Sequence, residues 1–219
     1  MFLDVDGTLW NSTPVVAVAW NRVLEEHGLA TRVSAHRLTQ LFGKPMDIIA
    51  DELLPDLAPE ARYALLKPIL SAEEKAIRDN HKDISYPGVS EGIKKLSGRF
   101  AVCIVSNCQA GYIELVMDKL GIAPYIRDYE SYGRTGLYKA ENIRLVKERN
   151  HFRAPVYLGD IQGDQDASRA AGVAFIHAAY GFGTADAPDA TVNSFAELES
   201  LLEPLENAAA GSTAGSAGN

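Results

Sequence analysis

The chain has 219 residues, of which 47% are hydrophobic and 23% charged, and its formal net charge is −8. This length suffices for one large or two small folded domains. The acidic balance argues against general binding to nucleic acids or to anionic membranes, because phosphate groups attract basic surfaces. No apolar run is long enough to cross a membrane as a helix. A small anionic ligand stays compatible if local cations or a metal reverse the field.

The start of the chain and its two cysteines bear on the compartment. Met1 leads directly into Asp4 without a basic segment or a long apolar segment, so we expect no signal peptide. Cys103 and Cys108 lie near the end of one predicted strand, where neighbours rarely reach disulfide geometry. We therefore expect reduced thiols in a cytoplasmic protein.

Residues 12–83 carry helix patterns and contain no strand candidate. Thr13 and Pro14 form a favourable N-cap and first-turn pair, and apolar residues then recur at helical spacing up to Gly28. Three further helices are expected, beginning after Ser34, near Met46 and at Ala61. The last should run to about residue 80, and Pro68 should kink or break it.

From about residue 84 onward, helix patterns alternate with short apolar strands. Strands are expected within 100–107, 125–132, 155–160 and 173–180, and helices within 89–96, 113–120, 141–150 and 166–171. Such alternation predicts an α/β fold, a doubly wound parallel sheet with helices on both faces. We assign residues 1–11 and 84–207 to this core domain, and 12–83 to a small helical domain inserted after the first strand. The small, uncharged tail, 208–219, is predicted to be disordered.

Polar side chains follow three of the predicted strands. Asp4 and Asp6 follow the first strand, Ser106 and Asn107 end the second, and Asp160 follows the strand within 155–160. In open parallel sheets, ligands bind beyond the carboxyl ends of the strands. Three separate segments therefore deliver polar groups to one edge of the sheet, which predicts an active site there.

These residue types fit phosphoryl chemistry. Mg2+ prefers oxygen ligands, and Asp4 and Asp160 can supply carboxylates to it. Beside such a cation Asp4 can attack phosphorus, while Asp6 can protonate the leaving oxygen and then activate water. The phosphoryl oxygens need hydrogen-bond donors or a positive charge, and the candidates are Ser106, Asn107 and Lys139.

Four segments resemble the motifs of the haloacid dehalogenase-like (HAD) phosphohydrolase superfamily. The segment "DVDGTLW" is similar to its first motif, DxDGT, and "VSN" to its second. Lys139 in "GLYKAEN" stands where the third-motif lysine belongs, and "GDIQGD" fits the fourth motif, GDxxxD. In addition, "YPGV" and "YGFG" resemble the phosphoglycolate phosphatase-like branch. That branch carries a helical C1 cap at the place of residues 12–83.

The resemblance implies a role for each matching residue. Asp4 would be the nucleophile that forms an aspartyl-phosphate, and Asp6 the general acid and base. Mg2+ would be held by the Asp4 carboxylate, the Asp6 backbone carbonyl and Asp160, with Asp164 supporting its water ligands. Ser106 and Lys139 would bind the phosphoryl group. Asp6 also argues against dehalogenation, because the dehalogenases of the superfamily lack an acid there.

Other positions have weaker or ambiguous signals. Many relatives place proline after the third-motif lysine, whereas Ala140 follows Lys139 here. Lys44 in "FGKP" is a candidate substrate-binding residue or an ordinary exposed lysine, and Asn107 contacts substrate or shapes a turn. Asp166 is interpreted as a helix N-terminal residue favoured by the helix dipole. The five histidines show no metal-ligand spacing, and we expect surface or structural positions for them.

The leading functional hypothesis is a Mg2+-dependent phosphatase that acts on a small phosphorylated metabolite. A phosphomutase of the β-phosphoglucomutase type would share the cap and the motifs, and would return the phosphoryl group to a sugar. A non-catalytic phospho-acceptor domain, such as a response-regulator receiver, would accumulate phosphorylated Asp4, but receivers lack a long helical insertion. The identity of the phosphomonoester, and the choice between monomer and homodimer, stay open at this point.

Overall fold

The computed structural model describes residues 1–203, and its centre is one parallel six-stranded sheet. The strand order is β3-β2-β1-β4-β5-β6, and every neighbouring pair is parallel. The strands are β1 (Phe2–Leu3), β2 (Cys103–Ser106), β3 (Asp128–Ser131), β4 (Val156–Gly159), β5 (Ala174–Ala178) and β6 (Ala190–Val192). The predicted α/β class is confirmed, whereas β6, an edge strand of three residues, was not predicted. The predicted tail, 208–219, lies outside the described residues.

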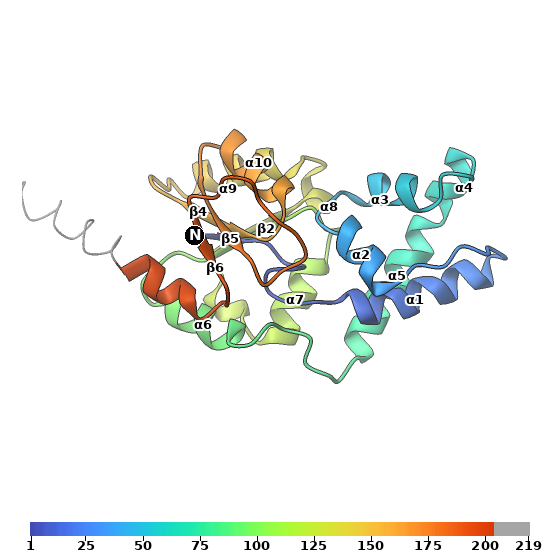
Figure 1. The fold of residues 1–219 in the computed structure, drawn as a ribbon, viewed down its shortest axis with the longest axis horizontal. Helices are drawn as coiled ribbons and strands as arrows, with labels where there is room; N and C mark the ends of the chain where they lie inside the picture. The colour runs from blue at the N-terminus through green and yellow to red at the C-terminus, as the bar shows by residue number, and fades with distance from the viewer. Residues whose placement is uncertain (204–219) are drawn as a thin grey trace, which may run out of the picture.

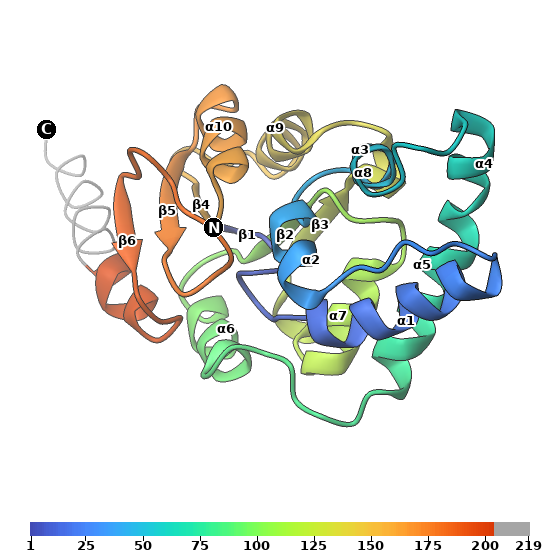
Figure 2. The ribbon, with the colours of Figure 1, turned by 45° about the vertical axis from the view of Figure 1, so that its right-hand side comes forward.

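Helices cover both faces of the sheet. They are α6 (Val89–Ser97), α7 (Tyr112–Leu120), α9 (Lys139–Arg149) and α10 (Gln162–Ala170), with the short η1 (Ala123–Tyr125) and α8 (Tyr132–Thr135) between them. Figure 2 shows α9 and α10 on one face and α6 and α7 on the other. Side chains alternate between the faces, so Phe2 packs with the α9 side while Leu3 joins the larger cluster on the opposite side.

Five helices follow β1 and form a separate group beside the sheet (Figure 1). They are α1 (Thr13–Glu26), α2 (Ala35–Leu41), α3 (Met46–Leu53), α4 (Pro59–Ala64) and α5 (Leu66–Asp79). The expected break in the last predicted helix occurs at Leu65, between α4 and α5. Pro68 lies in the first turn of α5. Backbone N–H groups in the first turn have no hydrogen-bond partner within the helix, so the missing N–H of proline costs no hydrogen bond there. The extent of this group as a domain, 12–83, stays a prediction.

Helices α7 and α9 start one and two residues earlier than predicted, and α10 starts four residues earlier. The expected start was Asp166, but α10 begins at Gln162 and places Asp164 in its first turn. Asp164 Oδ2 accepts hydrogen bonds from the backbone N–H groups of Asp160 (3.0 Å) and Ile161 (3.2 Å). These bonds satisfy donors that the helix start leaves open. Asp166 is exposed in the second turn, and accepts a hydrogen bond from Gln162 instead.

Two further expectations concern the state of the cysteines and the presence of membrane-spanning helices. Cys103 and Cys108 are free thiols, as the sequence predicted. Each helix within residues 1–203 is too short or too polar to span a lipid bilayer.

Candidate active site

Four of the predicted site residues meet at the carboxyl edge of the central strands. Asp4 directly follows β1, Ser106 is the last residue of β2, and Asp160 directly follows β4. Lys139 is the first residue of α9, which packs against β2 and β3. All four side chains are buried, with 1–5% of their surface exposed. The topology thus converts positions far apart in the sequence into one compact polar cluster.

Lys139 joins two of the carboxylates. Its Nζ lies 2.8 Å from Asp4 Oδ1 and also contacts Asp164 Oδ1. Burial alone would lower the pKa of Lys139, but the charges of Asp164 and Asp4 outweigh it and raise that pKa above its usual value. Lys139 is therefore a permanent cation in the centre of an acidic cluster.

The acids outnumber this cation. Oxygen atoms of Asp4, Asp160 and Asp164 lie within 4.8 Å of one another. Burial, and then the neighbouring carboxylates, raise the pKa of Asp160 well above its usual value. Burial also raises the pKa of Asp4, although Lys139 opposes this shift. Three buried carboxylates beside one ammonium group leave excess negative charge, and a divalent cation would compensate it.

The Asp160 carboxylate accepts two hydrogen bonds and is closely surrounded by two glycines. Its Oδ2 accepts a hydrogen bond from the Phe182 backbone N–H at 2.7 Å, and its Oδ1 from the Thr8 hydroxyl at 3.3 Å. A Cβ atom on Gly7 would lie 2.0 Å from Asp160 Oδ2, and one on Gly181 would lie 2.3 Å from Asp160 Cβ. Gly7 also has a φ of +84°, which L side chains rarely adopt. The two glycines therefore allow the loops to close around the carboxylate.

Asp6 occupies a different environment from Asp4. Its Oδ1 accepts hydrogen bonds from Trp10 Nε1 (3.0 Å), Tyr112 OH (3.1 Å) and the Ser12 hydroxyl. Burial raises the pKa of Asp6 to about 7, although the bonds from Ser12 and Tyr112 oppose the shift. Two carboxyl groups two residues apart thus differ: Asp4 contacts a cation, and Asp6 is held by neutral donors.

Ser106 and Asn107 connect the sheet edge to the helical group. The Ser106 hydroxyl is buried, and its hydrogen bond is among the effects that lower the pKa of Asp4. Asn107 Nδ2 donates to the Gly43 carbonyl at 2.8 Å, so the turn after β2 contacts the loop between α2 and α3. Asn107 therefore does shape the junction between the two parts of the molecule.

Lys44 lies at a cavity beside the acidic cluster, but its ammonium group is paired with Glu52. Its Nζ is 2.6 Å from Glu52 Oε1, and both side chains are more than one-third exposed. The structure thus places Lys44 near the predicted site and directs its ammonium group toward a glutamate of α3.

A cavity lies between the sheet edge and the helical group, and several of its residues were not predicted. Its volume is about 30 Å3, on the order of one water molecule. The lining residues are Asp4, Asp6, Phe42, Gly43, Lys44, Met46, Ile49, Glu73, Ser106, Asn107, Cys108, Gln109 and Tyr112. Glu73, Gln109 and Tyr112 carry no local motif in the sequence. The sequence offers one signal for Glu73. It stands between Ile69 and Ile77 on the face of α5 that is otherwise apolar.

Glu73 is the most unusual of these residues. It is 3% exposed, and burial raises its pKa to about 7. Its Oε2 accepts a hydrogen bond from Trp20 Nε1 at 2.8 Å, and its Oε1 from Gln109 Nε2 at 2.9 Å. A carboxyl group of α5 is thus fixed between α1 and the loop after β2.

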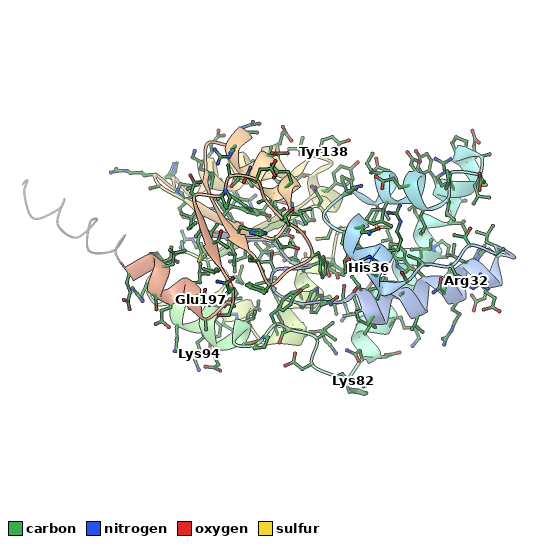
Figure 3. The ribbon with its side chains drawn as sticks, viewed as in Figure 1. Arg32, His36, Lys82, Lys94, Tyr138 and Glu197 are labelled. Atoms are coloured by element: carbon green, nitrogen blue, oxygen red, sulfur yellow. The ribbon has the colours of Figure 1, made fainter. Side chains whose placement is uncertain are left out.

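The histidines lie apart from the acidic cluster, with one exception. His36 belongs to α2, in the helical group, as Figure 3 shows. His177 of β5 is buried, and its Nε2 lies 3.2 Å from the Asp160 backbone carbonyl. Among residues 1–203, the group of side chains spaced to hold a metal consists of aspartates alone.

The sequence profile of the haloacid dehalogenase-like hydrolases matches residues 1–178. The chain belongs to this family. Among curated proteins, a phosphoglycolate phosphatase of Nitrosococcus oceani is 27% identical over 215 residues, which cover 92% of this chain and 95% of that protein. A phosphoglycolate phosphatase of Vibrio parahaemolyticus is 26% identical over 216 residues, which cover 89% and 92%.

Solved structures agree on the fold. A crystal structure from Haemophilus somnus, described as a predicted phosphoglycolate phosphatase, matches with a TM-score of 0.78 and 19% identity, and covers 91% of this chain and 96% of that one. A predicted phosphatase from Clostridium acetobutylicum matches with a TM-score of 0.79 and 19% identity, covering 92% and 97%. At this identity the likeness concerns the fold.

Proposed function

We propose that the protein is a Mg2+-dependent phosphatase that hydrolyses small phosphate monoesters through a phosphorylated Asp4. The observation that carries this proposal is the contact of Asp4 with Lys139 inside a group of three buried carboxylates. A carboxylate that must attack an anionic phosphoryl group needs positive charge next to it, because like charges would otherwise repel. The match to curated phosphatases over most of the chain supports the same reaction class.

Each residue of the cluster then has a separate task. Asp4 attacks phosphorus, and the ester oxygen leaves with a proton from Asp6. Lys139 and the Ser106 hydroxyl face the oxygens of the phosphoryl group and offset its charge. Water then attacks the aspartyl-phosphate, with Asp6 accepting its proton, and inorganic phosphate is released.

Asp6 suits proton transfer because of how it is held. Its three hydrogen-bond donors all reach Oδ1, so the carboxyl group keeps one orientation toward the cavity that it lines. The second oxygen, Oδ2, is then the atom that carries and gives up the proton. An acid fixed beside the leaving oxygen contributes without the need for a chance encounter with solvent acid.

The three-aspartate cluster suits a divalent cation by its charge and by its all-oxygen donor set. Asp4 and Asp160, with the Asp6 backbone carbonyl, would hold Mg2+, and Asp164 would support its water ligands. When bound, the ion would supply positive charge that lowers the repulsion between Asp4 and the substrate. Asp164 would keep its second task, since its Oδ2 accepts the backbone N–H groups at the start of α10.

The helical group, 12–83, acts as a cap in this proposal. The cavity between the cap and the sheet edge is narrow, with a volume of about 30 Å3, so we expect the two parts to separate when a substrate enters. The bonds Asn107–Gly43 and Gln109–Glu73 cross this boundary and would re-form on closure. Closure would exclude bulk water while Asp4 is being phosphorylated.

The test is release of inorganic phosphate from a panel of phosphorylated metabolites and p-nitrophenyl phosphate, with Mg2+ or with EDTA. Phosphoglycolate belongs in the panel because curated relatives are named for it. We expect Mg2+-dependent release by the wild type and none by Asp4→Asn. Folded wild type without turnover of any compound would refute the proposal. Transfer of the phosphoryl group to a sugar instead of water would identify a phosphomutase.

A further inference from the structure

The cap side of the cavity presents hydrogen-bond acceptors. Glu73 accepts one hydrogen bond on each carboxylate oxygen, from Trp20 and from Gln109. Each oxygen has a second lone pair, so the carboxylate keeps acceptor capacity toward the cavity that it lines. The Trp20 and Gln109 bonds come from two directions and hold the group in place. Glu73 is thus a fixed, buried acceptor opposite the sheet edge.

Asn107 also lines this cavity, and its side chain holds a second acceptor. The bond from its Nδ2 to the Gly43 carbonyl fixes which end of the amide is oxygen. Its Oδ1 is buried and accepts no hydrogen bond from the residues that the structure describes. A buried acceptor without a donor destabilises the structure, and a bound molecule with an O–H or N–H group would relieve that cost.

Positive charge is scarce on this side. Lys44 is the one cationic residue among those that line the cavity in the described chain. Its Nζ is paired with Glu52, 2.6 Å away, and Arg37 lies 3.9 Å from the same glutamate. Lys139 is likewise committed to Asp4 and Asp164. On the cap side, a negatively charged leaving group would therefore meet Glu73 without a neighbouring unpaired cation among the described lining residues.

We propose, on the basis of the proposed phosphatase activity, that Glu73 is a specificity-determining residue, assisted by Asn107. It selects phosphomonoesters whose leaving group carries a hydroxyl or an ammonium group next to the ester, and it disfavours a carboxylate at that position. A hydroxyl or ammonium donor satisfies the acceptors of the cavity. A carboxylate leaves them unsatisfied and adds a like charge in a site of low dielectric constant.

Three substrates with one two-carbon skeleton test this selectivity: 2-phosphoglycolate, 2-hydroxyethyl phosphate and phosphoethanolamine. Their kcat/KM values are measured with Mg2+ at pH 8, above the pKa of about 7 that burial gives Glu73. We expect the hydroxyl and ammonium compounds to exceed 2-phosphoglycolate by about tenfold or more. Glu73→Gln should raise the relative value for 2-phosphoglycolate by about tenfold and lower that for phosphoethanolamine. Glu74→Gln, at the exposed neighbour on α5, should leave the ratios unchanged.

The wild-type ratios stand as a test even if Glu73→Gln fails to fold. A wild type that prefers 2-phosphoglycolate overturns the proposal, as do ratios that Glu73→Gln leaves within about threefold of wild type. In both cases p-nitrophenyl phosphate is still hydrolysed, so the phosphatase activity itself stands. Absence of turnover of p-nitrophenyl phosphate as well would instead refute the proposed function, and this inference with it.

Discussion

The two sides of the cavity hold acidic residues in opposite ways. On the sheet edge, Asp4 and Asp164 share Lys139, and Asp160 lies within 4.8 Å of them. On the cap side, Glu73 is held by the neutral donors of Trp20 and Gln109, and it forms no ion pair within residues 1–203. Charge paired with charge suits the binding of a metal and a phosphoryl group. A lone buried carboxylate suits discrimination among leaving groups. In our proposals, chemistry and selectivity thus belong to different elements of the fold.

The largest effect should come from the sheet edge. Asp4→Asn removes the proposed nucleophile, and kcat for p-nitrophenyl phosphate should fall by about 10⁴-fold or more. The amide keeps an acceptor for Lys139 and removes one negative charge from the cluster, so the thermal midpoint of unfolding should not fall. Asp6→Asn should also lose turnover, and intact-protein mass spectrometry can detect phosphorylated enzyme trapped in that variant. Substantial residual kcat in Asp4→Asn would show that another residue is the nucleophile.

Removal of the shared cation tests whether the sheet edge depends on charge pairing. Lys139→Met leaves buried carboxylates without a partner, and the free energy of unfolding should fall by about 3–5 kcal/mol. The double variant Lys139→Met/Asp164→Asn removes one of the unpaired charges and should recover part of the loss. Urea denaturation of the metal-free proteins measures both. Equal stability of the single variant and the wild type would mean that Lys139 does not compensate these acids.

The sequence alone indicated that Asp4, Ser106 and Asp160 meet at the sheet edge, because each of them stands at the end of a strand. Asp4 and Asp160 each directly follow a buried strand, and a parallel sheet brings all strand ends of one direction to one edge. The cap side offered no such signal. Glu73 lies in an amphipathic helix, and its partner Gln109 is 36 residues away, so their contact follows from the packing of α5 against the core. The start of α10 was misplaced because Asp164, rather than Asp166, accepts the free N–H groups there.

On the cap side, the buried carboxyl group of Glu73 should make the free energy of unfolding depend on pH. Glu73 has a pKa raised to about 7 in the folded state, against 4.5 for an ordinary glutamate. The unfolded chain therefore releases this proton first as pH rises, and the folded state loses stability between about pH 4.5 and 7. The loss should approach roughly 3 kcal/mol and then level off.

Glu73→Gln removes this titration. The difference in the free energy of unfolding between the variant and the wild type should grow in the variant's favour from pH 4.5 to 7. Glu74→Gln serves as the matched control, because Glu74 is exposed and paired with Arg78. Parallel pH profiles for Glu73→Gln and the wild type would mean that Glu73 is not buried as an isolated acid.

The smallest expected effect comes from Gly7. Comparison with Gly28 separates the cost of backbone strain from the effect of displacing Asp160. Gly7 and Gly28 have similar φ values, +84° and +73°, but a Cβ on Gly7 would overlap Asp160, whereas a Cβ on Gly28 has nothing within 4 Å. Both alanine variants should lose about 1 kcal/mol of stability to the strained backbone. Gly7→Ala should in addition weaken Mg2+ binding by about 10- to 100-fold, because Asp160 is displaced. Activity titrated with Mg2+ measures this affinity. If both variants titrate alike, Asp160 does not hold the ion, and the charge-paired side of the cavity would need another explanation.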